Sequence, residues 1–190
     1  MSQIYLGDSS LFALLWKCDQ DLAAQTKDGM CPKCGGRLDV GNYPRKPRGG
    51  RGLLGPEYAL RLSFCCATQG CRSRRTPPST RFLGRRFYLG AVVILVSALR
   101  DGLTIRRSAQ LKEMIGVDAR TLRRWRSWWR EAFARSPFWR SVRARLSPPV
   151  DARQAPASLL DRFGRGPKDL VRLLQFLSPV TTRAGLAMAG

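Results

Sequence analysis

The sequence CPKCGG at residues 31–36 and the sequence CCATQGC at residues 65–71 decide how the first half of this chain folds. Each contains cysteines separated by a short turn, the arrangement that presents two thiolates to one tetrahedral metal ion. A site closed by four thiolates has no open position for a substrate, so it stabilises a fold without catalysing a reaction. We predict one structural Zn²⁺, bound by Cys31, Cys34, Cys66 and Cys71.

The third ligand is one of two adjacent cysteines. Residues 58–64 alternate apolar and polar side chains, which predicts a half-buried strand. Its apolar face comprises Tyr58, Leu60, Leu62 and Phe64. Cys66 continues this face because alternate residues of a strand point the same way. We therefore predict Cys66 as the ligand, with Cys65 as the alternative. A second short strand at residues 37–43 completes the layout of a zinc ribbon.

The charge of the chain is strongly positive. Its 190 residues include 34 Lys and Arg, 13 Asp and Glu and no His, which gives a net charge of +21. This excess indicates a polyanionic partner. Of the basic residues, 28 are arginine, whose guanidinium forks suit phosphate and guanine. The missing histidine excludes a catalytic histidine and any histidine-bound zinc.

The chain shows no sign of secretion or membrane insertion. The longest apolar run, Phe87–Leu99, has 13 residues, fewer than the ~20 that span a bilayer. Six cysteines without a signal peptide favour a reducing compartment. We therefore expect a cytoplasmic protein, associated with the nucleoid through DNA, and no membrane partner.

Residues 103–130 have the pattern of a helix-turn-helix. A short helix at residues 108–115 precedes a turn at residues 116–118, and Asp118 can cap a second helix at residues 119–134. Apolar residues at helical spacing form the core stripe of this second helix: Leu122, Trp125, Trp129 and Phe133. Most of its other positions carry arginine, and such dense charge favours contact with a nucleic acid.

The residues of the second helix divide by their expected contacts. Recognition helices read bases mostly from their N-terminal half, so the groove-facing candidates are Arg120, Thr121 and Arg124. The phosphate-binding candidates are Arg123, Arg126 and Arg130. A second basic surface follows the second cysteine pair and comprises Arg72, Arg74, Arg75, Arg81, Arg85 and Arg86. The loop Arg45–Arg51 lies in a segment rich in Pro and Gly, expected to be mobile, and is a further candidate for backbone or minor-groove contact.

The predicted fold class is α+β and mainly α, with a small β zinc ribbon followed by a helical helix-turn-helix domain. We divide the chain into an N-terminal helix (1–30), the ribbon with its basic loop and tail (31–86), the helix-turn-helix domain (87–150) and a C-terminal helical tail (151–190). The first helix, at about residues 10–25, carries Cys18 on its apolar face as a core residue.

The order of these features resembles a known family. A Cys-Pro-x-Cys-Gly ribbon, a basic stretch with TPPS at residues 76–79 and FLGRR at residues 82–86, an apolar helix and a helix-turn-helix follow one another over residues 31–135. This order is similar to the N-terminal DNA-binding half of bacterial insertion-sequence transposases and to the small proteins encoded beside them. The resemblance implies binding to transposon ends or related double-stranded DNA, with a transposase or recombinase as partner. A homodimer stays open.

The resemblance does not extend to transposition chemistry. Beyond Arg135 the only acids are Asp151, Asp161 and Asp169, in a segment too short for a ribonuclease-H-like catalytic domain. The scattered acids and the absence of histidine offer no catalytic constellation, so we expect no enzyme. Two alternatives to DNA binding are an RNA-binding zinc-ribbon protein and a partner-recruiting adaptor. The adaptor would dock through Leu159, Leu160, Phe163, Leu170, Leu173, Leu174 and Phe176, unless these residues close the core.

Overall fold

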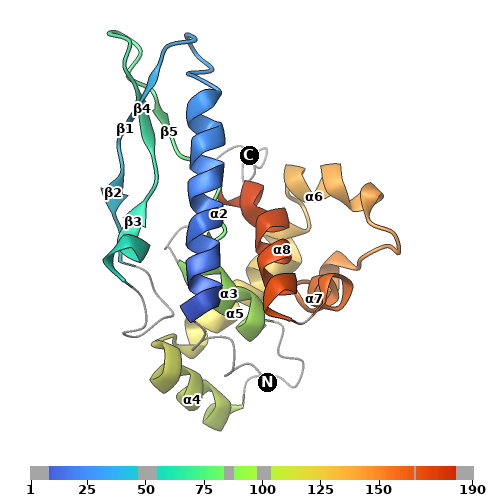
Figure 1. The fold of residues 1–190 in the computed structure, drawn as a ribbon. Coiled ribbons are helices and arrows are strands. Elements are labelled where there is room, and N and C mark those ends of the chain that lie inside the picture. The colour runs from blue at the N-terminus through green and yellow to red at the C-terminus, as the bar shows by residue number, and fades with distance from the viewer. Residues whose placement is uncertain (1–8, 47–54, 84–87, 98–103, 165, 183–190) are drawn as a thin grey trace.

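The computed structural model describes residues 9–46, 55–83, 88–97, 104–164 and 166–182 (Figure 1). Within these ranges the protein is mainly helical with a small antiparallel sheet, which confirms the α+β, mainly α expectation. Most of the loop Arg45–Arg51, as well as Arg85 and Arg86, lies outside the described residues.

The long helix α2 (Ser9–Asp28) forms the axis of the described structure (Figure 1). It extends a few residues beyond the predicted range at its C-terminal end. Its buried face includes Leu11, Leu15 and Cys18, so the predicted core position of Cys18 is confirmed. The next turn of the chain leads from α2 directly into Cys31.

The described residues of the range 31–75 (31–46 and 55–75), which we call the ribbon, run beside α2 (Figure 1). Its strands are β1 (Leu38–Val40), β2 (Tyr43–Pro44), β3 (Leu60–Arg61), β4 (Phe64–Cys66) and β5 (Arg74–Arg75). An antiparallel sheet has the order β1-β4-β5, and β2 pairs with β3 as a separate two-stranded ladder. The cysteine pairs therefore lie at one end of the ribbon and the β2–β3 ladder at the other.

The predicted continuous strand at residues 58–64 is wrong in detail. A 3₁₀ turn, η1 (Pro56–Ala59), occupies its beginning, and a break separates β3 from β4. Leu60 is exposed and Arg61 is 3% exposed, the reverse of the expected alternation. The expected alternation returns at Phe64 and Cys66, which are both buried.

A short hairpin joins the ribbon to the helical part. Strands β6 (Phe82–Leu83) and β7 (Tyr88–Leu89) pair antiparallel, and α3 (Gly90–Ser97) follows. The expected apolar helix therefore begins at Gly90, within the apolar run Phe87–Leu99, and the last residues of this run lie outside the described part. A Cβ atom on Gly90 would lie 2.7 Å from the Leu174 side chain and 3.1 Å from the Thr80 carbonyl oxygen, so a glycine allows this close approach.

Two helices joined by a three-residue turn come next. Helix α4 (Ile105–Ile115) is followed by Gly116, whose φ of 67° is the left-handed conformation that favours glycine. Helix α5 (Ala119–Trp128) begins after Asp118, whose carboxylate accepts a hydrogen bond of 2.6 Å from the Thr121 backbone N–H. The predicted cap is confirmed. A π-helical turn, η2 (Trp129–Phe133), continues α5 to near the expected end.

The remaining elements are short helices: α6 (Pro137–Val142), η3 (Arg143–Arg145), η4 (Ala152–Gln154), α7 (Ala157–Phe163), α8 (Pro167–Leu177) and η5 (Ser178–Thr181). Helices α7 and α8 lie within residues 151–190, where a helical tail was predicted. The apolar residues of α7 and α8 that could have served an adaptor join one large core with α2, α3 and α5. Trp129 and Phe133, both 0% exposed, lie in this core.

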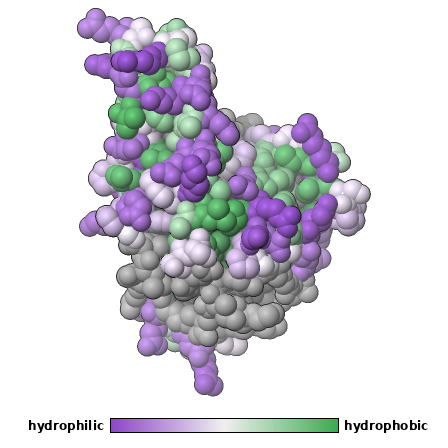
Figure 2. Space-filling view, viewed as in Figure 1, coloured by the Kyte–Doolittle hydropathy of each residue, from purple (hydrophilic) through white to green (hydrophobic). Residues whose placement is uncertain are grey.

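A second, smaller hydrophobic cluster lies in the ribbon and reaches α2. It comprises Ala23, Cys31, Leu38, Phe64 and Cys66. Figure 2 shows mostly hydrophilic residues over the ribbon and an apolar area lower on this face, where an open groove runs between α2 and α8. Among the described helices, none is long and apolar enough to cross a bilayer.

Candidate metal centre and basic surfaces

The side chains of the four predicted metal ligands form one cluster. The Sγ atoms of Cys31, Cys34, Cys66 and Cys71 all lie within 4.8 Å of one another. Cys34 Sγ lies 3.4 Å from Cys66 Sγ, and Cys31 Sγ lies 3.8 Å from Cys71 Sγ. Both distances are far longer than a disulfide bond of about 2.05 Å. The cluster therefore consists of four free thiols that can hold a metal ion.

The spacing of the sulfurs fits a tetrahedral ion. Four thiolates at about 2.3 Å from a central zinc would lie about 3.8 Å from one another, inside the range between the 3.4 Å contact and the 4.8 Å limit. Thiolate is a soft ligand, which hard cations such as Mg²⁺ and Ca²⁺ bind poorly. The donor set thus suits Zn²⁺, with no position left for a substrate.

The turns that hold these thiols depend on glycine and serine. Gly35 has a φ of 69°, and its backbone N–H donates to the Cys31 carbonyl oxygen at 2.7 Å. The Ser73 hydroxyl lies 3.1 Å from Cys31 Sγ and 3.4 Å from Cys71 Sγ. This hydroxyl lowers the pKa of Cys71 and, with the Lys33 backbone, lowers the pKa of Cys31 to about 6. Both thiols are thereby prepared to bind metal as thiolates.

Cys34 behaves differently from these two thiols. Contact with the Gly36 backbone lowers its pKa, but the thiols of Cys66 and Cys71 raise it, and the net result is a pKa of about 11. A bound metal ion would lower this pKa again, because its positive charge stabilises all four thiolates together.

The structure also distinguishes the two adjacent cysteines. Cys66 is 0% exposed and lies opposite Leu38 in the β1–β4 pair. Cys65 lies opposite Asp39, one position along the strand, so its side chain points to the other face of the sheet. Cys66 belongs to the cluster of four sulfurs and Cys65 does not. The choice of Cys66 over Cys65 therefore agrees with the geometry.

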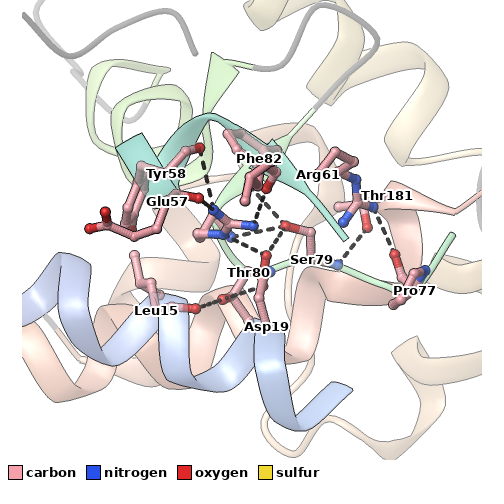
Figure 3. A network of polar contacts seen from close by, with 12 residues as sticks. Leu15, Asp19, Glu57, Tyr58, Arg61, Pro77, Ser79, Thr80, Phe82 and Thr181 are labelled. Carbon is pink, nitrogen blue, oxygen red and sulfur yellow. Dashed lines mark hydrogen bonds and ion pairs between the residues drawn. The ribbon is translucent and has the colours of Figure 1, made fainter. Parts of the chain in front are cut away.

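A buried polar network joins the ribbon to α2 (Figure 3). The Asp19 carboxylate accepts hydrogen bonds from the hydroxyls of Ser79 and Thr80, from the Thr80 backbone N–H and from Arg81 Nε, at 2.5–2.9 Å. Arg81 also donates to the carbonyl oxygens of Glu57, Tyr58 and Leu60. The guanidinium lies within about 5 Å of three aromatic ring centres, those of Trp16, Tyr58 and Phe82.

This network corrects one of our predictions. Arg81 was expected on a basic surface that contacts nucleic acid, but it is 1% exposed and ion-paired with Asp19. Its role is structural, because it connects α2 with the 3₁₀ turn η1 and with β3. The sequence offered no signal for this pairing, since Asp19 precedes Arg81 by 62 residues.

Along α5 and η2, Arg120 and Arg124 lie opposite the core stripe, and Arg123, Arg126 and Arg130 lie beside it. Leu122, Trp125, Trp129 and Phe133 are between 0% and 8% exposed, which confirms that stripe. Arg120, Arg123, Arg124 and Arg130 are exposed, and Arg126 is half-buried. Thr121 is buried, and its hydroxyl accepts a hydrogen bond of 3.1 Å from Arg124 Nη2. Thr121 therefore orients a candidate side chain and is not itself on the surface.

The ribbon carries the other described basic candidates. Arg72, Arg74 and Arg75 are all exposed. Arg74 Nη1 donates to the Gly41 carbonyl oxygen at 2.9 Å and to the Ser63 hydroxyl at 3.1 Å, which fixes the direction of its guanidinium. The ribbon also contains Tyr43, whose contacts with arginine the sequence did not suggest.

Comparison with known proteins adds no assignment: no family model, no curated protein and no solved structure matches this chain. The site must be interpreted from its own residues.

Proposed function

We propose that this protein binds double-stranded DNA, with α4, the turn at residues 116–118 and α5 as a helix-turn-helix. Helix α5 enters the major groove, and one structural Zn²⁺ on the four thiolates of the metal centre stabilises the ribbon. Its biological setting is that of a mobile-element accessory protein or a transcriptional regulator. The protein itself has no catalytic activity, and it acts in the cytoplasm on nucleoid DNA.

The observation that carries the proposal is the two-sided character of α5. One side is held in the core by Leu122 and Trp125, and the other exposes arginines at successive turns. Like charges three or four residues apart on a helix repel one another. Between residues 118 and 135 the only acids are Asp118 and Glu131, and Asp118 is engaged at the N-cap. A polyanion would relieve this repulsion, and a groove of DNA is the polyanion that fits one helix.

The structure supports a division of roles along α5. Arg120 and Arg124 lie in its first two turns and would contact base edges, with Thr121 holding the Arg124 guanidinium in place. Arg123, Arg126 and Arg130 would contact phosphates, which position a protein without carrying sequence information. On the ribbon, Arg72, Arg74 and Arg75 would add phosphate contacts.

The alternative functions differ in how well the structure supports them. RNA binding remains a competitor, because a basic helix alone does not distinguish the two nucleic acids. The adaptor hypothesis loses its proposed docking residues, since most of them are buried in the core and the others pack against it. The proposed protein partner is a transposase or recombinase. If the protein is a homodimer, its two-fold symmetry would match a palindromic DNA site.

Selection from a random duplex library tests the proposal. The wild-type protein should enrich a defined motif, and a variant with Arg120→Ala and Arg124→Ala should lose preference at two or three positions of it. Arg140→Ala, which removes an exposed arginine from α6, serves as the matched control and should leave the motif unchanged. Failure to enrich any duplex, together with tight binding to a structured RNA, would overturn the proposal in favour of the RNA alternative.

A further inference from the structure

A cluster of arginines surrounds one tyrosine at the end of the ribbon away from the metal centre. The Arg45 and Arg74 guanidinium carbons lie 4.5 Å and 5.3 Å from the centre of the Tyr43 ring. Arg45 follows β2 and Arg74 belongs to β5, so the two cations come from distant parts of the sequence to the same ring. Both arginines are exposed, and Tyr43 is half-buried between the strands and solvent.

This cluster is organised before any ligand binds. The Gly41 carbonyl oxygen and the Ser63 hydroxyl hold Arg74 through Nη1, which leaves Nη2 and Nε able to donate to a ligand. The Arg45 backbone N–H is fixed by a hydrogen bond of 2.6 Å to the Ala59 carbonyl oxygen. Contact with the face of an aromatic ring restricts both side chains further. These side chains therefore lose less conformational entropy on binding a ligand than a flexible arginine would.

A buried arginine adds to the positive charge here. Arg61 lies directly opposite Tyr43 in the β2–β3 pair and is 3% exposed. Its Nη2 donates to the Pro77 carbonyl oxygen at 2.7 Å, whereas its Nη1 has no hydrogen-bond partner among the described residues. Burial lowers the pKa of Arg61, and Asp19 is the acid whose charge opposes this shift. An anion at this surface would add to the compensation of this buried charge.

We propose that Tyr43, Arg45 and Arg74 form a phosphate-binding site that takes the DNA backbone. The inference rests on the proposed function and adds to it a second contact, remote from α5. The two guanidinium carbons are no more than about 10 Å apart, because both lie against one ring. A separation within this limit lets the two guanidinium groups contact neighbouring phosphates of one strand, which rise about 3.4 Å each along the duplex axis. The site contributes affinity and orientation but no sequence preference.

The test compares the salt dependence of duplex binding between charge-matched variants. A variant with Arg45→Ala and Arg74→Ala loses about two phosphate contacts, which reduces the slope of log K against log salt by about 1.8. The affinity of the wild-type protein should then fall about tenfold more between 50 and 200 mM salt than that of the variant. A control with Arg153→Ala and Arg162→Ala removes the same charge from exposed positions elsewhere and should keep the wild-type slope.

Two further measurements keep the test decisive. Arg45→Glu alone should reduce duplex affinity even if the double variant folds poorly, and retention of one zinc per chain monitors the ribbon. In an NMR spectrum of the arginine Nε–H groups, micromolar concentrations of a short duplex should shift the Arg74 signal, whereas inorganic phosphate at the same concentration should not.

If the double variant keeps the wild-type salt slope while the α5 variants are still impaired, this site is wrong and the proposed function stays intact. If inorganic phosphate shifts the Arg74 signal as much as the duplex does, the site binds free phosphate and not the DNA backbone. If the wild-type protein binds no duplex at all, the proposed function itself is wrong.

Discussion

Replacement of Asp19 by asparagine tests how the ribbon is attached to the helical part. The carboxylate accepts four hydrogen bonds, and the side chains of Asp19 and Arg81 are 1% and 0% exposed. Asparagine has the same shape, but it removes the negative charge and points an amide N–H₂ group at hydrogen-bond donors. Arg81 is then a buried cation without its anion. Breaking a buried pair from one side costs about 3–5 kcal/mol.

The expected change is large enough to measure by thermal unfolding of the zinc-loaded protein. For a chain of this length, each kcal/mol shifts Tm by about 2–4 °C, so Asp19→Asn should lower it by about 6–20 °C. Asp21→Asn is the matched control on the same helix. It breaks the exposed pair of Lys17 and Asp21, whose side chains are 66% and 57% exposed, and should cost less than about 1 kcal/mol. If both variants unfold at the same temperature, the network does not stabilise the fold.

Three other substitutions have defined outcomes. Cys66→Ser should abolish the single bound zinc in metal analysis, whereas Cys65→Ser should retain it; the reverse result would reassign the ligand. Gly36→Ala places a Cβ against the Thr68 hydroxyl, 3.1 Å from Cys66 Sγ and 3.3 Å from Cys34 Sγ, so zinc affinity, measured by chelator competition, should fall about tenfold or more. Trp129→Ala should lower the free energy of denaturant unfolding by about 3–5 kcal/mol. Trp129→Phe should lower it by clearly less, because phenylalanine keeps most of the aromatic volume in the core and the buried Nε1–H that it removes has no hydrogen-bond partner among the described residues. Equal losses for the two Trp129 variants would contradict this.

The features that could be predicted from the sequence are those set by short-range spacing. The turns that bring Cys31 to Cys34 and Cys66 to Cys71 are local, so the metal centre followed from the two motifs. The same is true of the Asp118 cap and of the stripe from Leu122 to Phe133, because a 3.6-residue period defines one side of a helix. In each case the deciding residues lie within a few turns of one another.

The features that could not be predicted depend on distant partners. Arg81 sits in a polar, basic stretch, and nothing nearby indicates that Asp19 would bury it. Arg61 and Leu60 exchange their expected faces because the 3₁₀ turn η1 shifts the chain before β3, and a one-residue shift inverts a strand. The Tyr43 cluster joins β2 to β5 across the ribbon, so its residues are neighbours only after folding.

The salt dependence of binding to duplex DNA tests the central claim most directly. Contact with six or more phosphates predicts that the affinity of the zinc-loaded protein falls by about 10³-fold or more between 50 and 200 mM salt. The measurement is an equilibrium titration of a labelled duplex that carries the selected motif, repeated at several salt concentrations. Tight binding that is steeply weakened by salt is the result expected from the basic side of α5 and the ribbon. An affinity that stays flat over this range would contradict DNA binding as the function of this protein.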